Sequence, residues 1–320
     1  MVNVGKLIAF GPVPSRRLGQ SMGINNIPPK ICTYSCIYCQ LGRTLDIQLK
    51  RRAFYKPEEL FRDVKVKVDQ AADKKESIDY LTFVPDGEPT LDINLGKEIE
   101  LVRSVRSLGK KVAVITNASL IWMEDVRDEL SKADWVSLKI DAISSDIWHK
   151  INRAPGSLKL DKILKGISKF SCTFKGELNS ETLLIKDVND SDDEIEKISD
   201  FISNLKTKKS YISIPTRPPA ESWVKQPSEQ KINKAFQIFK DKGINIEYLI
   251  GYEGNTFAFT GDAERDLLSI TSVHPMRRDG VEELLSKAGA DWEIVKKLIK
   301  EDKLVEVAYK DKKFYMRKLS

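Results

Sequence analysis

Three of the four cysteines in this 320-residue chain lie on one short segment, as Cys32, Cys36 and Cys39. The spacing is C-x3-C-x2-C, within ICTYSCIYCQLGR at residues 31–43. A disulfide is a weak interpretation, because three clustered thiols leave one unpaired and Cys172 is far away in the sequence. Three thiolates on one loop can instead wrap a compact centre of soft metal. The pattern therefore predicts a metal-binding loop around which the rest of the chain is organised.

The residues around the triad narrow the kind of metal centre. A tetrahedral structural zinc site takes a fourth ligand, usually from a second Cys or His pair. His149 and His274 are the only histidines, and neither is in a paired ligand motif. An iron–sulfur cube has four irons, so three cysteines leave one iron open to another ligand. The alternative is a structural metal knuckle, in which case the chain would be a nucleic-acid-binding protein rather than an enzyme.

The triad, with Tyr38 directly before its third cysteine, resembles the signature of the radical S-adenosylmethionine (radical SAM) superfamily. The resemblance implies that Cys32, Cys36 and Cys39 hold a [4Fe-4S] cluster whose open iron binds S-adenosylmethionine. It implies reductive cleavage of S-adenosylmethionine to a 5′-deoxyadenosyl radical that abstracts hydrogen from a substrate. It also implies an electron donor such as ferredoxin or flavodoxin. The cofactors perform the difficult step, and the protein binds, orients and shields them.

Composition is that of an ordinary globular protein, with 41% hydrophobic and 31% charged residues. The first ten residues do not resemble a signal peptide, and no apolar run approaches membrane-spanning length. Few, clustered cysteines favour a reducing cytoplasm. The net charge is +6, and the basic excess lies in residues 1–56, which hold nine Lys/Arg against Asp46 alone. A positive surface near the cysteines would attract an anionic substrate such as RNA, whereas the simpler interpretation is a solvated charged face.

Strand-like and helix-like segments alternate along residues 21–249, which predicts parallel βα units and a partial (β/α)6 barrel related to the TIM barrel. The expected strands are 21–26, 78–84, 111–115, 135–140, 182–186, 210–214 and 244–249. The expected helices are 56–71, 95–108, 120–131, 158–170, 193–205 and 229–242. The Pro/Gly-rich segment GPVPSRRLG at residues 11–19 is expected to be a loop. The same segment resembles one in an uncharacterised radical SAM subgroup, loosely related to tRNA wyosine-synthesis enzymes.

Polar motifs follow several of the expected strands. Gly87, Glu88 and Pro89 resemble the superfamily's GGEP segment, which binds the amino group of S-adenosylmethionine, with Asp86 in place of the first glycine. Asn117, in TNA, resembles the superfamily's TNG and is expected to contact the ribose or carboxylate, with Ala118 in place of glycine.

Further cofactor contacts are expected from the later strands. Ser137, Lys139 and Asp141 alternate along residues 136–141, so they share one face of a strand, either lining the barrel mouth or facing helices. Arg153 is a candidate carboxylate partner through its planar guanidinium. Ile214 is the expected apolar contact to adenine. Glu181, Lys186 and Ser213 could also reach the cavity.

The carboxyl-terminal part has a different pattern. We expect domains at 1–250 and 262–320, with a glycine-punctuated linker at 251–261. Helices at 262–269, 279–287 and 292–301, followed by strands at 304–309 and 313–317, resemble a winged-helix domain. Such domains bind nucleic acids, leader peptides or other proteins. Residues 262–320 carry thirteen Lys/Arg against twelve Asp/Glu, which does not indicate DNA binding.

Two classes of substrate remain open for a radical enzyme. The first is RNA, with tRNA in a modification reaction as the leading candidate, for which Arg51 and Arg52 are candidate contacts. The second is a peptide or protein, including activation of a glycyl-radical enzyme.

Overall fold

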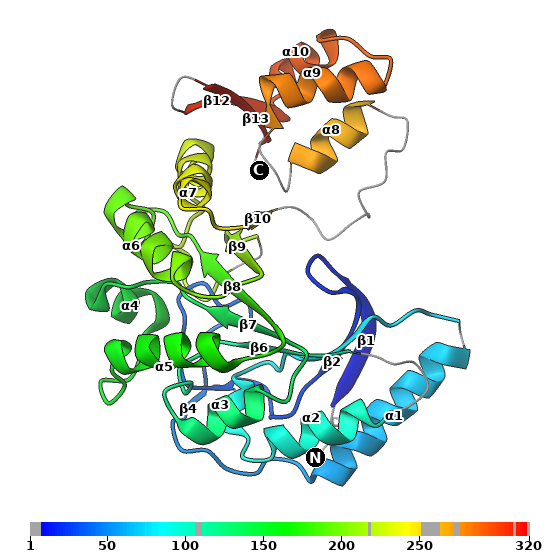
Figure 1. Cartoon of the computed structure of the whole chain (residues 1–320), viewed down its shortest axis with the longest axis vertical. Helices are drawn as coiled ribbons and strands as arrows, with labels where there is room; N and C mark the ends of the chain where they lie inside the picture. Colours follow the sequence, from blue (N-terminus) through cyan, green and yellow to red (C-terminus); the bar gives the residue numbers. More distant parts are fainter. Residues whose placement is uncertain are drawn as a thin grey trace.

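An eight-stranded sheet organises the larger part of the chain (Figure 1). The computed structural model describes residues 8–73, 75–105, 111–216, 219–250, 263–271, 276–309 and 312–318. In sheet order the strands are β1 (Ala9–Ser15), β2 (Gly19–Ile24), β5 (Tyr80–Phe83), β6 (Lys111–Thr116), β7 (Trp135–Lys139), β8 (Glu177–Leu183), β9 (Lys209–Ser213) and β10 (Ile246–Leu249). Neighbours from β2 to β10 are parallel, and β1 is antiparallel to β2.

Helices cover the outer side of this sheet (Figure 1). They are α1 (Pro57–Asp73), α2 (Leu95–Arg103), α3 (Glu124–Leu130), α4 (Ser145–Asn152), α5 (Leu160–Thr173), α6 (Asp192–Ser203) and α7 (Glu229–Asp241). Parallel strands joined by helical crossovers are buried on both faces, as the apolar sequences of β6 and β7 require. The predicted partial barrel is therefore confirmed.

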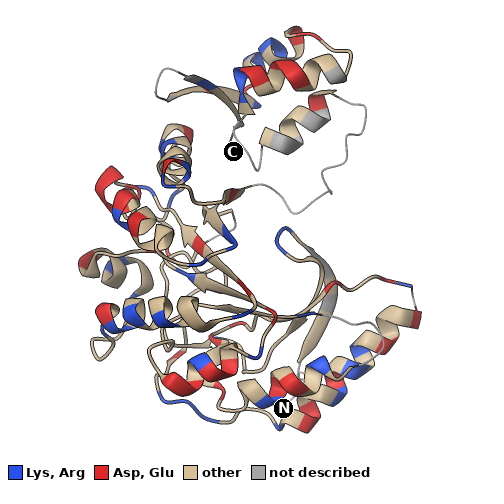
Figure 2. Ribbon diagram, in the orientation of Figure 1, with Lys and Arg blue, Asp and Glu red and all other residues tan. Residues whose placement is uncertain are grey.

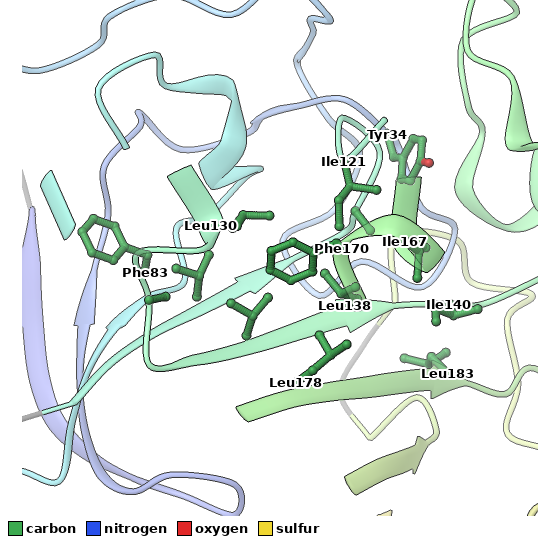
Figure 3. Close-up of a cluster of buried hydrophobic side chains, with 14 of the residues drawn as sticks. Tyr34, Phe83, Ile121, Leu130, Leu138, Ile140, Ile167, Phe170, Leu178 and Leu183 are labelled. Carbon is green, nitrogen blue, oxygen red and sulfur yellow. The ribbon is translucent and has the colours of Figure 1, made fainter. Parts of the chain in front are cut away.

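The main core lies between the sheet and its helices (Figure 3). On α5, Ile163, Ile167 and Phe170 recur at helical spacing and are buried on one face. Leu138 of β7 and Leu178 of β8 project towards the side of the sheet on which Ile167 and Phe170 lie (Figure 3). Burying a side chain of this size contributes about 1.5–3 kcal/mol, so this face fixes the helix against the sheet.

Three local predictions are wrong. The strand expected at 182–186 lies earlier, as β8 at Glu177–Leu183. Residues 9–15 form strand β1 rather than a loop, and they make a hairpin with β2. Prolines are tolerated there because β1 is an edge strand with an irregular register between Phe10 and Val13. Helix α4 is absent from the sequence-based assignment, since its eight residues, SDIWHKIN, give too short a periodic pattern.

The described carboxyl-terminal residues form a second, smaller core. It contains α8 (Ala263–Thr271), α9 (Arg278–Lys287), α10 (Glu293–Lys300) and a sheet in the order β11 (Met276–Arg277), β13 (Lys312–Arg317), β12 (Leu304–Tyr309). Strand β12 contacts α7 of the barrel. The helices and the hairpin agree with the expected positions, whereas the winged-helix interpretation and the domain limits stay predictions. The expected linker at 251–261 lies outside the described residues.

Helices long and apolar enough to cross a bilayer are absent from the described ranges.

Candidate active site

A cavity of about 370 Å³ opens at the carboxyl ends of the parallel strands. Its lining includes Cys32, Cys36 and Cys39 together with residues at the carboxyl ends of β7 and β8 and residues at or after the ends of β5 and β9. In barrels of this kind the reactive groups sit at the carboxyl ends of the strands, where several loops converge. The cysteine triad therefore lies where the fold can surround a ligand.

The first anchor of the cysteine loop is the turn after β5. The backbone N–H of Glu88 donates to the carbonyl of Ile31 at 3.2 Å, and that of Lys30 donates to the carbonyl of Asp86 at 2.6 Å. A Cβ atom at Gly87 would overlap the carbonyl oxygen of Ile31. Glycine is therefore required here for contact between two protein segments, next to Cys32, and Gly87 also lines the cavity.

The second anchor is the end of α4. The backbone N–H groups of Ser35 and Ile37 donate to the carbonyls of Asn152 at 3.1 Å and Ile151 at 2.9 Å. The last carbonyls of a helix have no partner within the helix, so the loop satisfies them and is fixed in return. Arg153, which ends α4, has a left-handed φ of 49°.

The third anchor is Glu221. Its backbone N–H donates to the carbonyl of Ile37 at 3.1 Å, and its carboxylate accepts from Arg43 at 2.8 Å and from Arg153 at 2.6 Å. Hydrogen bonds from these two guanidinium groups lower the pKa of Glu221 to about 2. Arg153 is thus engaged by a protein carboxylate and does not line the cavity.

Glu88 and Pro89 lie beneath the cavity rather than in its wall. The Glu88 carboxylate accepts from the hydroxyls of Thr90 at 2.6 Å and Thr116 at 2.5 Å, and from the backbone N–H of Asn117 at 2.8 Å. Burial raises the pKa of Glu88, and these hydrogen bonds oppose the rise. The carboxylate therefore ties the ends of β5 and β6 together.

Asn117 turns its side chain to the cysteine loop. Its amide nitrogen donates to Thr33 Oγ1 at 2.8 Å and to Cys32 Sγ at 3.5 Å. Ala118 has φ 62°, a left-handed conformation that favours glycine, which gives a physical reason for the glycine in the TNG pattern. The backbone geometry of that pattern is kept here without the glycine.

A buried ionic group occupies the barrel mouth. Glu181 pairs with Arg17 and with Lys139, whose Nζ lies 3.1 Å from Oε1, and accepts from Ser213 Oγ at 2.9 Å. Burial alone would raise the pKa of Glu181, but Lys139 and Arg17 outweigh it and lower the pKa to about 2. Lys139 also lies over the ring of Tyr38, 4.8 Å from its centroid. The two cations and one anion leave a net positive wall.

Asp141 connects this wall to the cysteines. It accepts from the Tyr38 hydroxyl at 2.5 Å and from the Asn152 amide at 3.2 Å, and the same amide donates to Cys36 Sγ at 3.3 Å. Ser137 shares the strand face of Lys139, but its hydroxyl is buried without a hydrogen-bond partner among the described residues. Alternation along β7 thus predicted the direction of these side chains, and only Lys139 reaches the cavity.

The thiols have the chemistry of a metal site. Burial raises the pKa of Cys32 to about 12 and also raises the pKa of Cys36, so a bound metal must displace their protons. Within the described ranges, no three His, Cys, Asp or Glu side chains are arranged to hold a single metal ion. A four-iron cluster makes a different demand, because each thiolate bonds its own iron. Amide donors aimed at ligand sulfurs are the outer contacts that such a centre uses.

The predicted site residues fall into two groups. Those that line the cavity are Cys32, Cys36, Cys39, Tyr38, Gly87, Lys139 and Ile214, with Glu181 and Ser213. Those that support the lining from behind are Glu88, Pro89, Asn117, Ser137, Asp141 and Arg153. Lys186 is exposed and outside the lining. The sequence analysis gave no role to Lys30 or to Asn152, because no local pattern marks either residue. Lys30 lines the cavity, and its backbone has a positive φ of 63°.

Arg51 is not a free surface cation. Its side chain is 5% exposed and donates to the carbonyls of Thr90 and Asp92, both at 2.8 Å. It also pairs with Asp125 and Glu129 of α3. The expected role of Arg51 as a nucleic-acid contact is therefore wrong, whereas Arg52 is exposed.

Comparison with known families gives one match that spans more than half of the chain. The model described as "Radical SAM superfamily" matches residues 26–202. A UPF0026 protein of Methanocaldococcus jannaschii is 46% identical over 98% of this chain and 96% of its own length. A probable dual-specificity RNA methyltransferase RlmN of Prochlorococcus marinus is 23% identical over 67% of this chain and 59% of its own length.

Solved structures share the fold at low sequence identity. A radical SAM methyltransferase from Sphaerobacter thermophilus is 17% identical, with a TM-score of 0.53 over 72% of this chain and 67% of that one. Streptococcus suis SuiB, bound to its precursor peptide SuiA, is 15% identical, with a TM-score of 0.51 over 69% of this chain and 47% of that one.

Proposed function

The chain belongs to the radical SAM superfamily, and we propose that Cys32, Cys36 and Cys39 hold its [4Fe-4S] cluster beside bound S-adenosylmethionine. The observation that carries the proposal is the placement of all three thiols in one cavity, on a loop anchored at three points. When bound, the reduced cluster and S-adenosylmethionine supply a 5′-deoxyadenosyl radical that abstracts a hydrogen atom from a substrate. Membership in this superfamily indicates an enzyme rather than a metal knuckle.

The chain's own residues bind and orient the ligands. Lys139 carries the positive charge of the wall and contacts the carboxylate of S-adenosylmethionine, and Glu181 offers acceptors at the same place. Ile214 provides the apolar surface for adenine. Glu88, Asn117 and Asp141 act one step back, by fixing the turn, the cysteine loop and Tyr38.

RNA is the proposed substrate class, with tRNA as the first candidate. The match to RlmN, an RNA methyltransferase, supports it, as does the basic excess of residues 1–56. Lys30 and Arg16 add positive charge to the cavity lining. A peptide or protein substrate is the second candidate, favoured by the nearly balanced charge of residues 262–320.

The test is anaerobic. The cluster is reconstituted, dithionite and S-adenosylmethionine are added, and 5′-deoxyadenosine is quantified with and without bulk tRNA from the host. We expect formation in the wild type, none with Cys36→Ala, and a marked increase with tRNA. Formation without a tRNA effect would redirect the search to peptides. A verified cluster that yields no 5′-deoxyadenosine under either condition would overturn the proposed chemistry.

A further inference from the structure

Two asparagine side chains point at the sulfurs of the cysteine triad. Asn117, after β6, donates from Nδ2 to Cys32 Sγ at 3.5 Å, and Asn152, at the end of α4, donates from Nδ2 to Cys36 Sγ at 3.3 Å. The two residues come from different elements and reach different cysteines. Among the residues that the structure describes, Cys39 receives no such amide.

The orientation of each amide is fixed by a second partner. The backbone N–H of Ser119 donates to Asn117 Oδ1 at 2.9 Å, so the oxygen must face that donor and the nitrogen must face the loop. Asn152 Nδ2 also donates to the Asp141 carboxylate at 3.2 Å, and a carboxylate accepts only from the nitrogen end. If either amide were rotated by 180°, its oxygen and nitrogen would exchange places and these hydrogen bonds would be lost. The hydrogen-bond network therefore fixes which end of each amide faces the sulfur.

Asn152 is also held rigidly. Its side chain is buried, with 4% of the residue exposed, and its own carbonyl accepts from the backbone N–H of Ser35. Asp141, which accepts from the amide, is itself fixed by the backbone N–H of Leu183 at 3.0 Å. The donor therefore has little freedom to turn away from Cys36, and its dipole is preorganised.

We propose that Asn117 and Asn152 raise the reduction potential of the cluster by donating hydrogen bonds to Cys32 and Cys36. Reduction by one electron makes the centre one unit more negative, and the thiolate sulfurs carry part of that charge. An N–H dipole aimed at a sulfur stabilises the reduced state more than the oxidised state, so the potential rises. Asn152 is buried and therefore surrounded by a low dielectric, which strengthens its dipole. The two residues are positioning residues, because they act through the cysteines.

This inference rests on the proposed cluster and names a property of it. It predicts that an electron donor of given potential reduces a larger fraction of this enzyme than of a variant without the amides. A purely structural role for the asparagines would change the amount of cluster held, or the stability of the chain. It would not move the midpoint of a full cluster.

The experiment measures the midpoint potential of the reconstituted full chain by redox titration followed by electron paramagnetic resonance, without S-adenosylmethionine. The variants are Asn117→Ala, Asn152→Ala and the double variant. The matched control is Asn204→Ala, whose amide donates to the carbonyl of Asp200, away from the cavity. Iron and sulfide per chain are determined for each sample. We expect a more negative midpoint for each single variant, a larger shift for the double variant, and none for Asn204→Ala.

A second measurement uses the wild-type chain alone, so it does not depend on whether the variants fold. The wild-type chain is labelled with 15N-asparagine alone, and the reduced cluster is examined by pulsed electron paramagnetic resonance. We expect a weak 15N coupling from the amides near the sulfurs. Full cluster occupancy with unchanged midpoints, or reduced wild-type cluster without 15N coupling, would overturn this inference and leave the proposed function standing. A wild-type chain that takes up no cluster would overturn both.

Discussion

At the scale of the residue, the buried carboxyl group of Glu98 makes the stability of this protein depend on pH. It lies on α2 beside Asp92, and both residues are fully buried. Asp92 Oδ2 and Glu98 Oε1 have no donor among the described residues, whereas Glu98 Oε2 accepts from the Asn26 amide at 3.3 Å. Burial first, and Asp92 second, raise the pKa of Glu98 to about 9. A proton on Glu98 removes the repulsion between the two carboxyl groups.

The sign of the pH effect follows directly. The folded chain keeps a proton on Glu98 that the unfolded chain releases near pH 4.5, so stability falls as the pH rises towards 9. One pKa unit corresponds to about 1.4 kcal/mol, so the loss is on the order of a few kcal/mol. Glu98→Gln keeps the shape without the charge. Its free energy of unfolding should exceed that of the wild type by an amount that grows from pH 5 to pH 9. Urea titrations measure this.

A neighbouring glutamate is the control. Glu100→Gln, on the same helix with an exposed side chain paired to Lys132, should show no such growth with pH. Equal pH profiles for Glu98→Gln and the wild type would contradict the buried proton.

Gly87 shows how one missing Cβ serves the metal site. Gly87→Ala would force the turn after β5 away from the backbone of Ile31, next to Cys32. We expect a lower iron and sulfide content after reconstitution and a loss of stability of about 1–3 kcal/mol, as for overpacked interiors. Gly156→Ala is the matched control, because a Cβ there meets nothing within 4 Å. Equal metal content in both variants would show that the contact is dispensable.

At the scale of the element, strand β1 and its hairpin with β2 were not predicted from the sequence pattern. The proline and glycine residues of the hairpin are typical of a loop, and the deciding contacts are distant in sequence. Leu18, in its turn, packs against Trp135, Tyr211 and Leu249 inside the barrel. Arg17 pairs with Glu181 of β8. The motif GPVPSRRLG therefore forms most of the edge strand β1 and the turn after it, and Leu18 of that turn is buried in the barrel.

Leu18→Ala should destabilise the protein by about 2–5 kcal/mol, because the residue is 3% exposed and its removal leaves a cavity. The matched control is Leu45→Ala, since Leu45 is 80% exposed and should change stability by less than about 0.5 kcal/mol. Urea denaturation compares the two variants. If both variants lost a similarly small amount of stability, the buried turn around Leu18 would contribute little to folding.

Short-range patterns predicted the cysteine loop, most strands and most helices, because each rests on spacing within a few residues. The amides of Asn117 and Asn152 were out of reach of that reasoning. Asn117 was expected to contact the cofactor, and no residue pattern near it indicates a hydrogen bond to Cys32, which is 85 positions away. Asn152 meets Cys36 across 116 positions, on a helix too short to recognise. Which side chain reaches the cavity depends on the tertiary structure. Lys139 and Ser137 share a strand face in the sequence pattern, but only Lys139 lines the cavity in the folded chain.

At the scale of the whole molecule, Lys and Arg are interspersed with Asp and Glu along the helices (Figure 2), and ion pairs neutralise part of the positive charge of residues 1–56. Arg17, Arg43 and Arg51 from the basic segment are all paired with carboxylates. Lys296, Lys297 and Lys300 of α10 are exposed, but Lys296 pairs with Glu293 and Lys297 with Glu264. An RNA substrate would therefore have to use other exposed cations, such as Arg52 or Lys300.

Lys300 is the lysine on α10 that decides whether this helix contacts RNA, because it is exposed and no ion pair is described for it. If RNA docks on α10, Lys300→Gln should weaken tRNA binding and reduce the salt dependence of the affinity by about one counterion. Lys162→Gln, an exposed lysine of α5, should leave both unchanged. Binding is measured by fluorescence anisotropy at several salt concentrations. A normal salt slope for Lys300→Gln would remove α10 from the RNA surface and favour a protein ligand there.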